Sequence, residues 1–170
     1  MEQNGLADTF KKNAIYRLNE NTRMLEISLQ EVTPELVWKK PNQSLNSIGN
    51  LVLHLCGNMR QYGISSLGNK PDTRQRDSEF TASGGLSKEA LLKQLIQTVE
   101  EVKHTIRLAT EEELLRERNV QGFTLSGIGI ILHVVEHYSY HTGQIAFWVK
   151  WIQNKDLGFY QNIDLNQKNE

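Results

Sequence analysis

The chain has 170 residues, a formal net charge of −1 and one cysteine, Cys56. This length suits one domain with a substantial core, no lysine- or arginine-rich block indicates a nucleic-acid partner, and a lone cysteine excludes an internal disulfide. Residues Met1–Gly5 lack the basic and apolar regions of a signal peptide, and no apolar run approaches the length of about 18 residues that a membrane span needs. We therefore expect a cytoplasmic protein without a membrane segment.

Helical spacing of apolar residues predicts a first long helix over residues 8–30. Thr33-Pro34-Glu35 predicts the start of a short helix, because threonine is a common cap, proline suits the first helical position and glutamate favours the positive end. Pro41 should end this short helix near Lys40. A second long helix is expected over residues 47–66, and its apolar stripe comprises Ile48, Leu51, Val52, Leu55, Met59 and Tyr62.

The residues from Gly68 to Gly85 are mostly polar and include Pro71, so they predict a long connection. Connections of this length often line a binding site or cross over the end of a helix bundle. Ser87 then predicts the start of a third helix, whose buried face extends to Ala109.

A short extended segment is expected at Gly122–Leu125, and Ser126 predicts the start of a fourth helix that ends near Asn154. This last helix would be about 40 Å long. Four long amphipathic helices with one long crossover connection, and no internal repeat, predict an all-α four-helix bundle. We expect a single domain over residues 1–170, with its core at about 8–155 and a polar C-terminal tail.

Two histidines one helical turn apart, His137 and His141, are the most informative feature of the sequence. At about 100° per residue they lie roughly 40° apart on the fourth helix, within its apolar face. Neutral imidazoles that face a core are costly unless each ring has polar partners. A divalent cation would satisfy one nitrogen of each ring, and imidazole is the commonest protein metal ligand. The pair therefore predicts a metal site.

A third ligand should come from another helix, and His54 is the best candidate because the second helix can pack beside the fourth. His54 lies at the edge of its apolar stripe, which would suit a cleft open to solvent. Three histidines with an open coordination position match a catalytic zinc arrangement. His104, between Lys103 and Thr105, is expected at the surface.

A simpler interpretation also fits this spacing, since histidines can merely form hydrogen bonds at helix contacts. On the same interpretation Trp148 and Trp151 are core or interface anchors, and Gln144 only bonds a neighbour. Cys56 is expected to be a small buried residue and not a nucleophile.

A rival motif is His133-Val-Val-Glu136-His137, which matches the H-x-x-E-H pattern of inverzincin metalloproteases. Those enzymes need a further glutamate ligand downstream, and the sole glutamate after His137 is the terminal Glu170. The helical phase also favours pairing His137 with His141 over pairing it with His133. We therefore favour the three-histidine site.

Three segments carry a family resemblance: Glu35-Leu-Val-Trp38-Lys-Lys-Pro41, Ser47-Ile-Gly-Asn-Leu-Val-Leu-His54-Leu and His133-Val-Val-Glu-His137-Tyr-Ser-Tyr-His141-Thr-Gly-Gln-Ile145. With them the chain resembles the DinB/YfiT-like superfamily of small four-helix metalloproteins. The resemblance implies a metal triad of His54, His137 and His141, with His133 as an accessory residue. It also implies a divalent metal, often zinc or nickel, and a homodimer.

Characterised members of this superfamily include thiol-dependent transferases and isomerases that act with low-molecular-weight thiols, and others are described as metal-dependent hydrolases. We therefore expect a metal-dependent enzyme that activates a thiol or water to attack a small-molecule substrate. The resemblance alone favours thiol transfer over hydrolysis. The alternatives are a non-catalytic metal-binding stress-response protein and a structural dimer. No general base is evident, because Glu136 projects about 100° from His137 toward the polar side of the helix.

Overall fold

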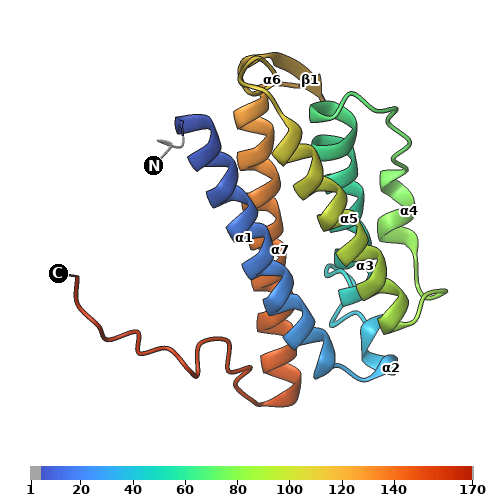
Figure 1. The fold of residues 1–170 in the computed structure, drawn as a ribbon. Helices are drawn as coiled ribbons and strands as arrows, with labels where there is room; N and C mark the ends of the chain where they lie inside the picture. The colour runs from blue at the N-terminus through green and yellow to red at the C-terminus, as the bar shows by residue number, and fades with distance from the viewer. Residues whose placement is uncertain (1–4, 170) are drawn as a thin grey trace.

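Four long helices account for most of the chain in the computed structural model, which describes residues 5–169 (Figure 1). Their ends lie within two residues of those expected from the sequence. They are α1 (Leu6–Gln30), α3 (Ile48–Met59) with its continuation η1 (Arg60–Leu67), α5 (Lys88–Leu108) and α7 (Gly127–Gln153). Met1–Asn4, on which the expectation of no signal peptide rests, and Glu170 lie outside the described residues. The prediction of an all-α four-helix bundle is confirmed.

The helices do not follow one another around the bundle. Helix α1 packs against α5 and α7, and α3 packs against the same two helices, so α1 and α3 lie across a diagonal. Helices α3 and α5 run in the same direction, so the segment between them returns along the outside of the bundle (Figure 1). This order makes α3 and α7 neighbours, as the proposed histidine triad requires.

Serine caps fix the starts of three long helices at the positions expected. The hydroxyls of Ser47, Ser87 and Ser126 each accept a hydrogen bond from the backbone N–H three residues later. At Ser47 the bond is reciprocal, because its own N–H donates to the side-chain oxygen of Asn50 at 3.1 Å. Each such cap typically contributes about 1 kcal/mol, so these residues define where the helices begin.

The connection from Gly68 to Gly85 contains a helix that the sequence did not indicate. Helix α4 (Arg76–Thr81) lies within it and packs on α3. The side-chain amide of Asn50 donates to the backbone oxygens of Glu79 and Ala82, at 2.9 and 2.7 Å. The connection therefore does more than cross over the bundle, because it is held against α3 by polar contacts.

Two further segments differ from expectation. The short helix α2 (Pro34–Val37) ends before Lys40. The second long helix has α geometry only to Met59 and continues as the π-helix η1, in which Tyr62 is buried. Single π-turns inside helices are frequent at functional sites.

The segment before α7 forms a small hairpin. Strand β1 (Glu117–Val120) pairs antiparallel with β2 (Phe123–Ser126), and Gln121 and Gly122 between them both have positive φ, as a two-residue type I′ turn requires. The expected extended segment is confirmed as β2, whereas β1 and the short helix α6 (Glu111–Leu115) were not foreseen. The hairpin covers the end of the bundle at which α7 begins (Figure 1).

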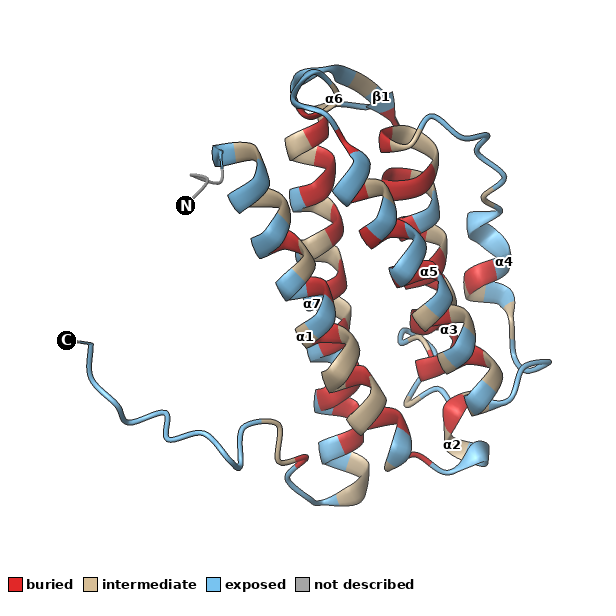
Figure 2. Cartoon of the chain, viewed as in Figure 1, coloured by how far each residue is buried: buried red, intermediate tan, exposed pale blue. Residues whose placement is uncertain are grey.

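The buried residues line the inward faces of the four long helices (Figure 2). The largest fully buried side chains are Tyr62 and Tyr138, whose rings fill the space between the helices, and Tyr138 shares a hydrogen bond of 3.0 Å with Thr22. Among residues 5–169, no helix combines the length and the apolar character that crossing a membrane would require.

Two glycines on α7 provide a matched test of this packing. An alanine Cβ at Gly127 would overlap the backbone oxygen of Glu113 and lie 2.8 Å from the Cα of Leu114, whereas one at Gly143 would meet no atom within 4 Å. We predict that Gly127→Ala lowers the free energy of unfolding by about 2 kcal/mol. Gly143→Ala should raise it by roughly 0.5–1 kcal/mol, because alanine is the better helix former. Urea denaturation measures both, and equal effects would contradict the prediction.

Candidate metal centre

The structure brings the three predicted histidines together. His54 comes from α3, and His137 and His141 come from successive turns of α7. One ring nitrogen of each lies within 4.8 Å of the others, and the Nε2 atoms of His54 and His137 are 3.1 Å apart. Nitrogens bound to one tetrahedral zinc ion at about 2.0–2.1 Å would lie roughly 3.4 Å apart. Small side-chain movements therefore suffice for all three to bind one cation.

The outer nitrogens of two rings are bound to oxygen atoms. His54 Nδ1 lies 2.9 Å from Glu79 Oε2 and 3.1 Å from Arg74 Nη2, which itself donates to Glu79, and His141 Nδ1 lies 2.7 Å from Gln144 Oε1. An acceptor at Nδ1 keeps the proton on that atom and leaves the lone pair on Nε2. Both rings therefore present Nε2 as a ligand atom. The Nδ1 of His137 is buried and has no hydrogen-bond partner among the described residues.

Glu79 is held by Arg74 in a buried ion pair. Arg74 Nε donates to Oε1 at 2.8 Å and Nη2 donates to Oε2 at 2.9 Å, and the two side chains are only 3 % and 8 % exposed. Burial raises the pKa of Glu79, but the hydrogen bonds from Arg74 and His54 outweigh it and hold that pKa below its ordinary value. The carboxylate is therefore charged and fixed when it accepts the proton of His54.

Space for this carboxylate depends on Gly57 of α3. A Cβ at that position would overlap the carboxylate of Glu79 and lie 3.0 Å from Arg74 Nε. Arg74 is fixed in turn by Gln61, whose side-chain oxygen accepts from Nη1 at 2.9 Å. The crossover segment and α3 thus build one polar support behind His54.

The imidazoles on α7 are held in their neutral form. Burial, followed by the neighbouring charges of His141 and His54, lowers the pKa of His137 to about 3. Burial also lowers the pKa of His141, against a smaller opposing effect of Gln144. Neutral imidazole is the form that binds a metal. Three converging imidazole nitrogens, two of them on rings with an outer hydrogen-bond acceptor, fit a divalent cation.

His133 is used differently. Its Nε2 lies 3.1 Å from Asn58 Nδ2, and its ring stacks on Tyr62 of η1 with centroids 3.9 Å apart. The three ring nitrogens that converge belong to His54, His137 and His141, and none belongs to His133. Glu136 is exposed. This arrangement does not favour the inverzincin motif, whose required downstream glutamate, Glu170, lies outside the described residues.

The remaining sequence candidates lie where they were expected. His104 is exposed on α5. Cys56 is buried, and burial raises the pKa of its thiol to about 12, so it is not a nucleophile at neutral pH.

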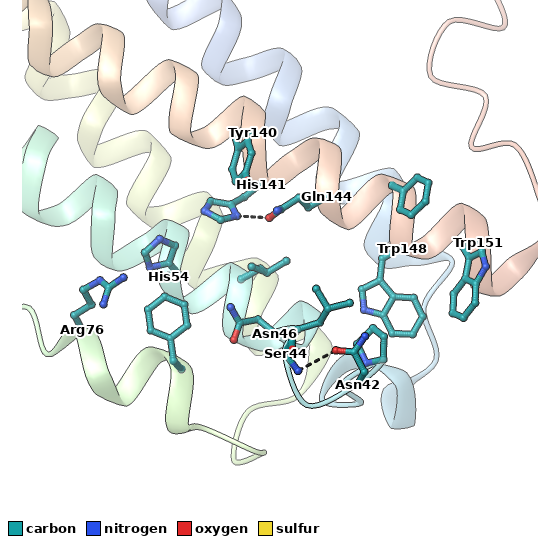
Figure 3. A pocket seen from close by; sticks show the side chains of 15 residues that line it. Asn42, Ser44, Asn46, His54, Arg76, Tyr140, His141, Gln144, Trp148 and Trp151 are labelled. Atoms are coloured by element: carbon teal, nitrogen blue, oxygen red, sulfur yellow. Dashed lines mark hydrogen bonds between the residues drawn. The ribbon is translucent and has the colours of Figure 1, made fainter.

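A pocket of about 900 Å³ opens beside the histidines (Figure 3). His54 and His141 line it, whereas His137 does not. The expectation that Trp148 is a core residue is confirmed, because it is buried, and it also lines this pocket. Trp151 lines the pocket and is 68 % exposed. Its other lining residues are Pro41, Asn42, Ser44, Leu45, Asn46, Leu51, Arg76, Phe80, Tyr140, Gln144 and Phe147.

The sequence missed the crossover residues of the site, Arg74, Arg76, Glu79 and Phe80. They lie in a stretch with no apolar periodicity, so no pattern placed them near His54. The one available signal was the unusual length of the connection, which is typical of segments that line binding sites.

Comparison with known proteins identifies the relatives of the chain. A family model described as "Protein of unknown function (DUF1572)" matches residues 5–165. No curated protein matches the chain. Three solved structures from Bacillus are similar to it.

The first is a DinB-like protein from Bacillus subtilis, with a TM-score of 0.65 and 18 % identity, covering 92 % of this chain and 99 % of that one. The second is a DinB-like protein from Bacillus cereus, with a TM-score of 0.66 and 13 % identity, covering 85 % and 91 %. The third is YfiT from Bacillus subtilis, described as a probable metal-dependent hydrolase with an unusual four-helix bundle topology, with a TM-score of 0.69 and 16 % identity, covering 91 % and 92 %.

At identities this low, the structural similarity shows a common fold and no more. The family model covers nearly all of the described residues. The resemblance found in the sequence is thereby confirmed. The chain belongs to the DUF1572 family, and it shares the four-helix-bundle fold of the DinB-like proteins and YfiT.

Proposed function

We propose that the protein is a metal-dependent enzyme in which His54, His137 and His141 bind one divalent cation. The observation that carries this proposal is the convergence of three imidazole nitrogens within 4.8 Å. The oxygen atoms behind His54 and His141, which direct both Nε2 lone pairs inward, support it. The description of the similar YfiT as a probable metal-dependent hydrolase agrees with it.

The open side of the site faces the pocket. His54 and His141 line the pocket and His137 does not, so a substrate in the pocket would meet the first two ligands. A divalent metal in such a site lowers the pKa of a bound water or thiol, so that a nucleophile is available near neutral pH. Glu79 and Gln144 keep the two rings at the pocket oriented.

The lining of the pocket favours a thiol as the nucleophile. No aspartate or glutamate lines it among the described residues, so no general base is at hand to take a proton from water. A thiol needs less assistance, because its ordinary pKa is about 8.5. Sulfur would attack an electrophilic carbon, the new carbon–sulfur bond would form as the bond to the leaving group breaks, and the thiol proton would pass to solvent. Since Cys56 is buried, the thiol must come from a small molecule.

Metal content provides the first test. Protein purified without a histidine tag should contain about one zinc or nickel ion per chain, measured by inductively coupled plasma mass spectrometry. We predict that His54→Ala, His137→Ala or His141→Ala lowers the affinity by more than the roughly 10–100-fold that is typical for loss of an outer partner. His104→Ala, an exposed histidine on α5, is the matched control and should bind normally. A wild-type protein that holds no metal and melts at the same temperature with added zinc or nickel would favour histidines that only pack.

The role of Glu79 provides a second test. Glu79→Gln preserves the size of the side chain but removes the charge that accepts the proton of His54. We predict that metal affinity falls by about 10–100-fold, measured by competition with a chromophoric chelator. Glu136→Gln, an exposed carboxylate on α7, is the control and should leave the affinity unchanged. An unchanged affinity in a folded Glu79→Gln protein would mean that this carboxylate does not support the site.

The reaction can be tested with a panel of substrates. Metal-loaded protein should join a low-molecular-weight thiol to an alkyl or aryl electrophile, and His54→Ala should abolish the rate above background. Product formation is followed by mass spectrometry, with esters and amides in the absence of thiol as the alternative panel. Metal-dependent ester or amide cleavage without thiol would assign hydrolysis instead, the activity named for YfiT. A metal-loaded protein inert toward every compound would favour a non-catalytic metal-binding protein.

A further inference from the structure

The pocket beside the histidines differs in character from one end to the other. His54 and Arg76 lie at one end, His141 lies close to them, and Trp148 and Trp151 lie at the other end (Figure 3). Between the ends the labelled side chains are neutral and polar, among them Asn46 and Gln144. A ligand that fits along the pocket must therefore carry a polar group at one end and an apolar group at the other.

The polar end favours negative charge. The guanidinium of Arg76 lies over the ring of Phe80, 4.9 Å from its centroid, and none of the ion pairs within residues 5–169 includes it. No carboxylate from the described part of the chain lines the pocket to compensate this charge. An anionic group bound there would be attracted by the positive charge of Arg76. A metal ion bound by the histidines would strengthen this attraction.

The apolar end is an aromatic wall on α7, formed by Phe147, Trp148 and Trp151. Phe147 and Trp151 lie one helical turn apart and are 72 % and 68 % exposed, and Leu45 also lines the pocket. Large exposed aromatic side chains that gather at a hollow are typical of binding sites. Trp148 follows His141 by seven residues, which places the wall about 10 Å along the helix from the proposed centre.

We propose that the pocket binds small anionic molecules that carry an aromatic or alkyl group about 10 Å from their reacting group. The cavity volume of about 900 Å³ suits a ligand of this size. Binding of the reacting group to a metal ion depends on the function proposed above. The contacts of the anion with Arg76 and of the apolar group with the aromatic wall do not need the metal.

A ligand series tests this inference with and without metal. Phenylacetate, 4-phenylbutyrate and 6-phenylhexanoate, with their neutral methylamides, are titrated into the protein as purified and after chelation. The fluorescence of Trp148 and Trp151 reports binding, while Trp38, bonded to the Leu86 carbonyl, stays outside the pocket. Affinity should rise by up to about fourfold per methylene until the ring reaches the wall. The anions should bind about threefold more tightly than their amides.

Two matched pairs of variants locate the binding groups. Arg76→Gln should remove the preference for anions, whereas Arg107→Gln, an exposed arginine on α5, should leave it intact. Trp151→Ala should weaken 6-phenylhexanoate by about tenfold without affecting acetate. Leu132→Ala, which removes an exposed apolar side chain of α7 outside the pocket, should change neither affinity.

Three results would overturn the inference: no dependence on chain length, equal binding of anions and amides, or equal effects within either pair of variants. Sedimentation equilibrium can give a fourth such result. If the protein is a dimer, and Trp151→Ala dissociates it without changing the ligand affinity, the aromatic wall is an interface between two copies of the chain. Binding to the chelated protein supports the ligand class even if no metal is found. If the metal-loaded protein binds no compound of the series, the proposed ligand class is wrong, whereas the proposed metal site is unaffected.

Discussion

The contact between His54 and the buried carboxylate of Glu79 is the interaction on which the site depends. A carboxylate with 8 % exposure and an arginine with 3 % exposure lose most of their hydration, and a buried ion pair of this kind rarely repays that cost in stability. The pair therefore needs an explanation other than stability of the bundle. It fixes the ring of His54 at 2.9 Å and keeps its proton on Nδ1, which is the arrangement that carboxylates provide behind metal-binding histidines.

The topology of the bundle explains where this carboxylate comes from. Helices α3 and α5 run in the same direction, so the chain between them must travel back along the length of the bundle. That return path lies over α3, and its residues can reach the outer side of His54 without any contribution from the four long helices. The crossover is thus part of the site, and α4 is held there by Asn50, whose side chain also caps the start of α3.

This origin also explains what the sequence could predict. Caps such as Ser47 and Ser126 and the phase of His137 and His141 are local or periodic features, so the long helices and the three histidines were found from the residues alone. Helix α4 has one apolar residue, Phe80, and is stabilised by hydrogen bonds to α3, so no periodic pattern marks it. The stacking of His133 on Tyr62 joins two helices that are far apart in the sequence, so no local pattern predicts it.

The same hydrogen bonds support the proposed metal site over histidines that only pack. Because Glu79 and Gln144 both offer oxygen to Nδ1, His54 and His141 direct their Nε2 atoms into one small space. In a metal-free cluster the Nε2 of His137 could donate one proton. It lies 3.1 Å from the Nε2 of His54, and so its proton would pair with the lone pair of that ring. A packed cluster would therefore leave the lone pair of His141 without a partner from the triad. A divalent cation accepts all three inward lone pairs at once, and the low pKa of His137 keeps the third of them available.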